Sequence, residues 1–196
     1  MTFVLGLTGS IGTGKSTTAK MFRCADIPVW DADAAVHALY AENGAAVDSL
    51  SQLCPSALIN GAIDREALKE WIAREPDALC QIEEIVHPLV ARDRAVFLAQ
   101  HRHAGTRLVV LDVPLLFESG ADKLCDAVLV VTVDADIQRE RVLARPMMTP
   151  EHFKTLLAKQ MPDNEKRARA TYVIETRSLD QTRDAIAALI EKLSSE

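Results

Sequence analysis

The chain has 196 residues, of which 48% are apolar and 26% are charged, with 22 basic and 28 acidic side chains. This composition excludes a largely disordered chain, and the length suits one ample core with an attached subdomain. A net charge of −6 and only two Trp and two Tyr exclude a general attraction to nucleic acid or an anionic membrane. No apolar run reaches the roughly 18 residues of a membrane span, and the start lacks the basic region of a signal peptide. We therefore expect a cytoplasmic protein with no nucleic-acid or membrane partner.

Short apolar runs alternate with helical patterns, which predicts a doubly wound α/β fold with a parallel sheet. The runs at 107–112 and 127–133 each contain a continuous apolar stretch, as in strands covered on both faces. The predicted strands are 3–8, 27–30, 107–112, 127–133 and 172–174. The predicted helices of this core are 15–25, 134–145 and 179–193.

Two helical segments interrupt the predicted sheet. Residues 34–103 show no clear strand; Asp64 is a plausible helix cap, and Pro76 and Pro88 stand where new helices would begin. Prolines also bracket a smaller excursion at 146–166. The predicted organisation is one domain with a helical insertion and a small lid. Its parts are a core of 1–33, 104–145 and 167–196, the insertion 34–103 and the lid 146–166.

The four cysteines, Cys24, Cys54, Cys80 and Cys125, lie far apart and form no CxxC pair. In a chain of this length without a secretion signal, they are best interpreted as reduced, mostly buried thiols. No structural zinc site is expected.

Residues 9–16, GSIGTGKS, match the phosphate-loop pattern GxxxxGK[ST] at each fixed position, with a strand before them and a helix after. The backbone amides of this loop and the start of the helix are predicted to bind the phosphates of a nucleotide, with Gly12, Thr13 and Gly14 in the turn. Lys15 would reach the β- and γ-phosphates, Ser16 would ligate Mg²⁺, and Thr17 would donate to the α-phosphate. The alternative is a glycine-rich turn that precedes a lysine by chance, and the strand–loop–helix context favours the phosphate loop.

The remaining sequence favours a small-molecule kinase over other phosphate-loop proteins. A GTPase normally carries Asn-Lys-x-Asp, which this chain lacks, and motors or large ATPases are usually longer. Asp31 and Asp33 follow the second predicted strand, so they should lie at the carboxyl edge of the sheet. Asp31 is equally well interpreted as the cap of the next helix. Asp33 is our candidate for the base that orients the acceptor hydroxyl and takes its proton.

Three further residues are candidates for handling phosphate charge. Asp112 ends the third strand, where a carboxylate can organise Mg²⁺ through water, although it could also be a solvated strand-end acid. Arg141 and Arg145 are four residues apart on one predicted helical face, just before the lid. Arginines there can neutralise a transferring phosphoryl group, and the alternative is an exposed charged face.

Several motifs spread over nearly the whole chain stand in an order and at distances found together in one known family. They are LTGSIGTGKS at 7–16, DAD at 31–33, IEEIVHP at 82–88, DVPLLFE at 112–118 and QRERVLAR at 138–145, with Gln160. With these motifs the chain resembles the dephospho-coenzyme A kinases, which are P-loop kinases of small molecules. The resemblance implies a P-loop NTPase-like core with a five-stranded parallel sheet flanked by helices, a helical coenzyme-binding domain and a lid.

The resemblance also implies the reaction: transfer of the ATP γ-phosphate to the ribose 3′-hydroxyl of dephospho-CoA, the last step of coenzyme A biosynthesis. By position, Asp33 resembles the family's catalytic carboxylate. Lys15 and Arg141 are expected to take part in catalysis by neutralising phosphate charge. His87, Leu115 and Phe117 resemble parts of the acceptor side. Their alternatives are structural, His87 as a buried hydrogen-bonded joint and the other two as core. ATP, Mg²⁺ and dephospho-CoA are the implied ligands, and no obligatory protein partner is evident.

Three departures from the family pattern are visible. Ser10 replaces a common Gly, Pro146 follows Arg145 where Asp is common, and residues 170–177 differ on the side where such kinases contact adenine. We expect these changes to alter ATP affinity more readily than to abolish activity.

Two other functions remain open at this point. A shikimate- or gluconate-type kinase would share the loop, although shikimate kinases typically carry a Gly-Gly motif that this chain lacks. A nucleotide-sensing module would be expected to have lost the base or the lid arginine, and both residue types are present.

Overall fold

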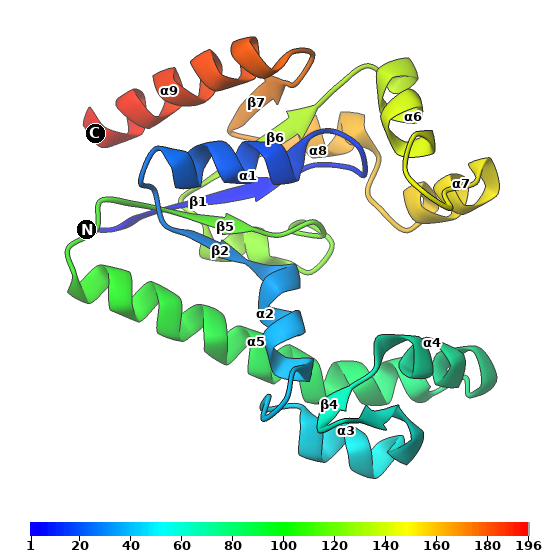
Figure 1. Ribbon diagram of the computed structural model, residues 1–196. Coiled ribbons are helices and arrows are strands. Elements are labelled where there is room, and N and C mark those ends of the chain that lie inside the picture. The colour runs from blue at the N-terminus through cyan, green and yellow to red at the C-terminus, as the bar shows by residue number, and fades with distance from the viewer. Residues whose placement is uncertain (196) are drawn as a thin grey trace. The chain divides into compact units, whose positions relative to one another are not determined.

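The computed structural model describes residues 1–195, which divide into two compact units. One unit comprises residues 1–30 and 101–195, and the other comprises residues 31–100. The first contains a five-stranded sheet in the order β2 (Val29–Asp31), β5 (Leu108–Asp112), β1 (Phe3–Thr8), β6 (Ala127–Thr132) and β7 (Tyr172–Glu175). The strand pairs β1 with β5, β1 with β6 and β6 with β7 are parallel (Figure 1). The predicted parallel α/β core is confirmed.

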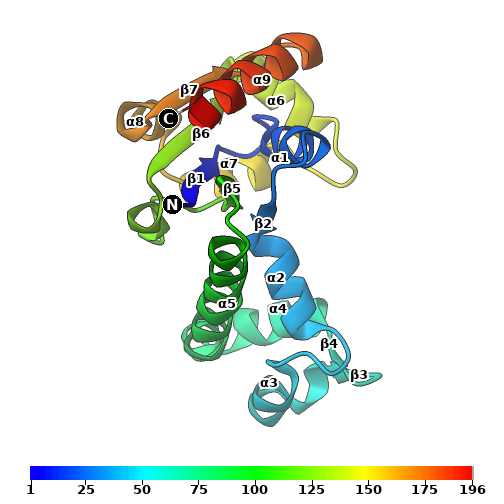
Figure 2. The same cartoon turned by 90° about the vertical axis from the view of Figure 1, so that its left-hand side faces the viewer.

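Helices cover both faces of this sheet because its strands are apolar on both sides. Leu5 and Leu7 of β1 pack in one cluster with Phe22 of α1 and with Ile186 and Leu189 of α9. Figure 2 shows α1 and α8 on opposite sides of the sheet. The helices of this unit are α1 (Lys15–Cys24), η2 (Ala121–Leu124), α6 (Ala135–Leu143), α7 (Pro150–Ala158), α8 (Asp163–Arg169) and α9 (Leu179–Ser195).

The unit of residues 31–100 is mainly helical, with its own buried core. Tyr40, Leu50, Leu68 and Val86 belong to that core, each from a different helix. Its elements are α2 (Ala32–Tyr40), α3 (Val47–Leu53), η1 (Pro55–Ala57), β3 (Leu58–Ile59), β4 (Ala62–Ile63), α4 (Arg65–Arg74) and most of α5 (Ala78–His103). Asp64 caps α4 as predicted, since its carboxylate accepts a hydrogen bond from the Ala67 amide at 2.8 Å.

The expectation that residues 34–103 contain no strand is wrong, because β3 and β4 pair as a short antiparallel hairpin. Asn60 and Gly61 form its turn, with φ of 52° and 78°. An Asn-Gly pair with positive φ at both positions is the preferred two-residue hairpin turn. The signal was therefore present in the sequence, and the two-residue strands were too short to show an alternating pattern.

The expectation that Pro88 begins a new helix is also wrong. Pro88 lies inside α5, which runs unbroken from Ala78 to His103. A proline removes a single amide donor from a helix, and packing on both sides can hold the helix together. Val86 lies in the unit's core just before Pro88, and Leu89 and Val90 pack against that core just after it.

The four cysteines are thiols, as expected, but they are not mostly buried. Cys54 is buried and Cys125 is half-buried, whereas Cys24 and Cys80 are exposed. Cys24 is the last residue of α1, and Cys80 lies two residues into α5, so their side chains are not required in the cores. Within residues 1–195, no helix is both long and apolar enough to cross a membrane.

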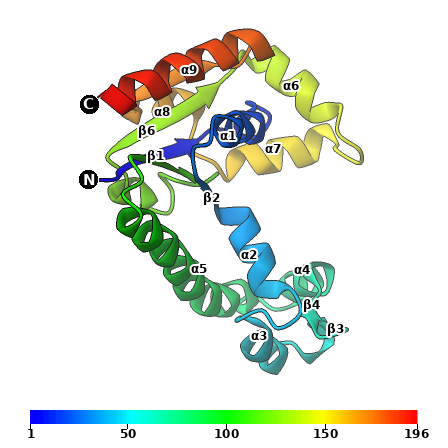
Figure 3. The same cartoon turned by 60° about the vertical axis from the view of Figure 1, so that its left-hand side comes forward.

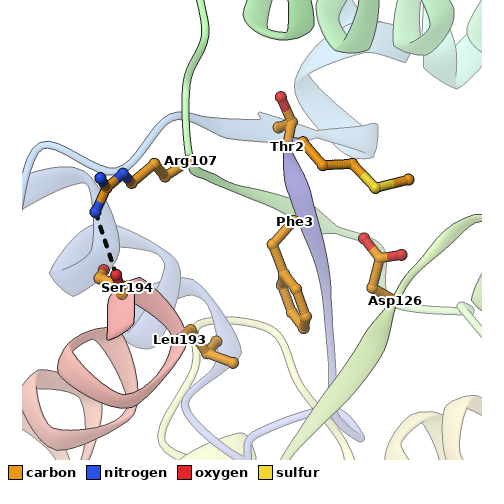
Figure 4. A pocket seen from close by; sticks show the side chains of 7 residues that line it. Thr2, Phe3, Arg107, Asp126, Leu193 and Ser194 are labelled. Atoms are coloured by element: carbon orange, nitrogen blue, oxygen red, sulfur yellow. Dashed lines mark hydrogen bonds between the residues drawn. The ribbon is translucent and has the colours of Figure 1, made fainter. Parts of the chain in front are cut away.

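A cavity of about 580 Å³ opens at the amino ends of the strands, as Figure 4 shows. Two of its polar lining residues form hydrogen bonds within the protein: Asp126 accepts from the Val4 amide at 2.8 Å, and Arg107 donates to the Ser194 carbonyl at 3.4 Å. Because Phe3 at the start of β1 lines this cavity, it lies at the opposite end of the strand from the phosphate loop.

Candidate active site

The predicted phosphate loop lies between β1 and α1, and glycine is required at its turns. Gly12 and Gly14 have φ of 81° and 86°, a conformation that side-chain-bearing residues rarely adopt. A Cβ on Gly12 would also clash with Val142, and a Cβ on Gly9 would lie 2.6 Å from the Val131 carbonyl. The loop leads directly into α1, so its amides and the positive end of the helix dipole face the same space.

Two glutamines hold the tip of this loop through the backbone of Ile11. The Gln138 side chain donates to the Ile11 carbonyl at 2.7 Å, and the Gln160 side chain accepts from the Ile11 amide at 3.0 Å. Thr13 braces the turn from within, because its hydroxyl donates to the Ser10 carbonyl at 2.8 Å. Both glutamines stand in the motifs of the family resemblance, but no rule of spacing in the sequence connects them with Ile11.

Lys15 and Asp112 form an ion pair at 2.5 Å across the carboxyl ends of β1 and β5. Asp112 is only 2% exposed, so the interpretation of it as a solvated strand-end acid is wrong. A buried carboxylate requires a cation or several donors nearby. The ammonium predicted to contact phosphate is therefore held at the sheet edge by the carboxylate predicted to organise Mg²⁺.

A pocket of about 330 Å³ brings the loop together with both predicted arginines. Arg141 and Arg145 line it along with Gly12, Gly14 and Thr17. The two arginines do not share a helical face, because α6 ends at Leu143 and Arg145 lies in the following turn. Pro146 explains the early end, since the residue before a proline is disfavoured in a helix. Figure 3 shows α6 and α7 joined by this turn.

Leu115 and Phe117, the two predicted acceptor-side residues that follow β5, differ in how far their side chains are exposed. Leu115 is 41% exposed, whereas Phe117 is buried, with the Arg169 guanidinium 4.4 Å from the centre of its ring. Glu118, next in the chain, forms an ion pair at 2.9 Å with Lys166 of α8, a lysine with no exposed side-chain surface. Sequence analysis missed Lys166, because nothing in the pattern of α8 marks it as buried.

Glu118 joins the segment before α8 to the segment after β5. Its carboxylate accepts from the Met161 amide at 2.7 Å, and Lys166 also donates to the Pro114 carbonyl at 3.3 Å. Burial by itself would raise the pKa of Glu118, but the Met161 amide and the Lys166 ammonium outweigh that effect and hold the pKa below 4.5. Glu118 is therefore a carboxylate at neutral pH.

Replacing Lys166 with Met should lower the free energy of unfolding by about 3 kcal/mol, because it leaves Glu118 without its cation. Urea unfolding at pH 7, followed by intrinsic fluorescence, measures this change. The double variant Lys166→Met/Glu118→Gln should recover part of the loss, since the uncompensated charge is gone. A loss below about 1 kcal/mol for Lys166→Met would show that the pair contributes no more than an exposed one.

The same pair predicts how stability varies with acidity. Because the folded-state pKa of Glu118 lies below the ordinary 4.5, its contribution is complete above that value. It is lost as pH falls through the lower, folded-state pKa. The difference in stability between wild type and Lys166→Met should accordingly narrow below pH 4.5, and a constant difference from pH 7 to pH 3 would contradict the assignment.

Three predicted residues lie in the unit of residues 31–100. Asp31 is the N-cap of α2, where its carboxylate accepts from the Ala34 amide at 3.0 Å, so its structural interpretation is confirmed. Asp33 lies in the first turn of α2 and is exposed. His87 is exposed on α5, which contradicts the alternative of a buried joint.

Known proteins match this sequence along almost its whole length, and the matches belong to one family. The model of the dephospho-CoA kinase family matches residues 3–181. A dephospho-CoA kinase of Jannaschia sp. (strain CCS1) is 58% identical over 194 residues, which cover 99% of this chain and 98% of the relative. The dephospho-CoA kinase of Cereibacter sphaeroides is 57% identical over 188 residues, covering 96% and 94% of the two chains.

Solved structures share the fold. A crystal structure of a protein from Thermus thermophilus superimposes with a TM-score of 0.82 at 34% identity, covering 98% of each chain. The dephospho-CoA kinase from Campylobacter jejuni superimposes with a TM-score of 0.75 at 24% identity, covering 100% of this chain and 98% of its own.

Proposed function

The chain belongs to the dephospho-CoA kinase family, and from that premise we propose which of its residues bind, position and activate the substrates. The reaction transfers the γ-phosphoryl group of ATP to the 3′-hydroxyl of dephospho-CoA and yields CoA and ADP. Such a transfer asks little covalent chemistry of the protein, so positioning and charge neutralisation account for most of the rate.

ATP is assigned to the phosphate loop and the pocket beside it. The observation that carries this assignment is the pocket itself, where Gly12, Gly14 and Thr17 meet Arg141 and Arg145. Amides of the segment 12–17 would hold the phosphates, and Lys15 would leave Asp112 to reach the β- and γ-phosphates. Arg145 would also bind the nucleotide, and Arg141 would neutralise negative charge on the phosphoryl group during its transfer.

The acceptor is assigned to residues outside this pocket. Asp33 orients the 3′-hydroxyl and takes its proton late in the transfer, as charge develops. This role is supported by its exposure in the first turn of α2 and by Asp31 alone serving as the cap. His87 and Leu115 are exposed and available to contact the coenzyme. Phe117 is buried against the Arg169 guanidinium and would support the neighbouring Leu115.

Mg²⁺ fits the donors at the end of the sheet. Ser16 offers an exposed hydroxyl at the start of α1, and Asp112 offers a carboxylate that would act through water. Hard oxygen donors of this kind suit Mg²⁺, which keeps several waters and is commonly shared with substrate phosphates. When bound, the ion neutralises phosphate charge. Before ATP binds, the ion pair with Lys15 holds the Asp112 carboxylate at the end of β5, where it would face the ion.

The remaining assignments concern larger parts of the chain. Residues 34–103 are proposed to bind the coenzyme, and residues 146–166 to act as a lid that excludes water from the transfer. We also propose that the reaction takes place in the cytoplasm.

The acceptor position is tested with a coupled ADP-release assay. Dephospho-CoA should be phosphorylated with ATP and Mg²⁺, and its 3′-deoxy analogue should give no ADP above the rate without acceptor. Omitting Mg²⁺ with excess chelator should reduce turnover by at least about 100-fold, since the ion supplies several kcal/mol of charge stabilisation. Rapid phosphorylation of a small polyol in place of dephospho-CoA would contradict the assignment.

A further inference from the structure

Thr176 follows β7 and is 5% exposed, yet its polar groups reach three other segments. Its hydroxyl lies 2.6 Å from the Thr13 carbonyl and 3.3 Å from the Thr132 carbonyl. Arg141 donates to the same hydroxyl at 3.3 Å and to the Thr176 carbonyl at 2.7 Å. In the sequence, Thr176 stands out only as part of residues 170–177, which differ from the family pattern.

A threonine hydroxyl has one hydrogen and two acceptor sites, which decides how these contacts are used. The shorter distance directs the hydrogen to the Thr13 carbonyl, and the acceptor sites receive Arg141. Both interactions can therefore exist at once. The Thr176 hydroxyl therefore donates a hydrogen bond to the phosphate loop and accepts one from Arg141, the arginine predicted to neutralise phosphate charge.

Holding the Thr13 carbonyl sets the direction of the next amide. In a trans peptide the C=O and the following N–H point in opposite directions. The structure contains no cis peptide bond within the described residues. The hydrogen bond from Thr176 therefore turns the Gly14 N–H away from Thr176. Gly14, with its φ of 86°, would otherwise have wide conformational freedom, because glycine has no side chain to restrict it.

We infer that Thr176 is a positioning residue that sets the Gly14 amide and the Arg141 guanidinium for ATP phosphates in one arrangement. The inference rests on the proposed ATP site. Thr176 lines the same pocket, and the inference gives it a part in nucleotide affinity that acts through Gly14 and Arg141. Gln138 acts in the same way one step earlier, since its hold on the Ile11 carbonyl sets the Gly12 amide.

Thr176→Val tests this role, because valine keeps the shape and removes the hydroxyl. We expect the KM for ATP to rise about tenfold, the free-energy equivalent of one hydrogen bond at the upper end of the usual range. The KM for dephospho-CoA should stay within about twofold. The kcat should stay within about threefold, because Arg141 keeps its 2.7 Å hydrogen bond to the backbone carbonyl of residue 176 and the Gly14 amide serves bound ATP before and during transfer. Thr176→Ser should restore the KM for ATP. Thr176→Ala should reproduce the rise and serves if the valine variant does not fold.

Thr18→Val is the matched control. Thr18 is fully buried in the adjoining helix α1, and its hydroxyl has no hydrogen-bond partner in the described part of the chain. Its loss should leave both KM values unchanged. A lower melting temperature of Thr176→Val with an unchanged KM for ATP would overturn the inference and leave Thr176 a structural residue.

Calorimetric titration of ATP into Lys15→Met separates this inference from the proposed function. Weaker ATP binding by Lys15→Met together with normal binding by Thr176→Val would defeat the inference alone. Normal ATP binding by Lys15→Met would instead defeat the assignment of ATP to the loop.

Discussion

Asp33→Asn should lower kcat about 1,000-fold, because a positioned carboxylate base typically accelerates proton transfer by two to four orders of magnitude. The amide keeps the size and first-turn position of the side chain but cannot take the proton of the 3′-hydroxyl. The expected loss is in kcat, measured by ADP release at saturating dephospho-CoA and ATP.

Asp31→Asn is the matched control, two residues earlier. Asn can accept the capping hydrogen bond from the Ala34 amide as Asp31 does, so turnover should remain within about threefold of wild type. ATP affinity should be the same in both variants. If Asp33→Asn retained a tenth or more of the wild-type kcat, Asp33 would not be the base.

Lys15→Met should reduce kcat/KM for ATP by at least about 1,000-fold, because it removes the charged donor to the phosphates. A second effect is expected without any substrate. Asp112 is 2% exposed and would lose its ammonium partner, so the variant should also unfold at a lower temperature than wild type.

The double variant Lys15→Met/Asp112→Asn separates these two effects. Removing the buried carboxylate that has lost the Lys15 ammonium should return much of the lost stability, whereas activity should stay at the level of Lys15→Met or below. Recovery of activity together with stability would mean that Lys15 serves only to neutralise Asp112. Thermal unfolding and the ADP-release assay on the same preparations give both answers.

The strands and core helices could be predicted because their signals are local and strong. Continuous apolar runs at 108–112 and 127–132 gave fully buried strands, and the glycines of residues 9–14 stand where positive φ and close packing require them. Pro88 misled the prediction because a proline's effect depends on what packs around it, and Val86 and Leu89 supply that packing.

Part of the site could be predicted from the sequence. The residues that stand in motifs could be found, whereas the distant residues that contact them could not. The residues of the loop, Asp112 and Arg141 could be found because each stands at the end of an element or within a motif. The partners that orient them could not, since Thr176 lies 163 positions from Thr13 and Lys166 lies 48 from Glu118 in the chain. Such pairs form only when the strands are in place. No motif in the sequence indicates which single side chains will meet.

Ile11 receives one glutamine from each side of the chain segment 139–159, because Gln138 precedes that segment and Gln160 follows it. The two ends of this segment are therefore held close together by their hydrogen bonds to Ile11. The fold has already lost the conformational entropy of bringing these ends together. For such a loop, doubling the number of residues costs only about 0.6 kcal/mol more. Residues can therefore be gained or lost at Met147, which is 97% exposed and follows Arg145, while the two glutamines keep their hydrogen bonds to Ile11.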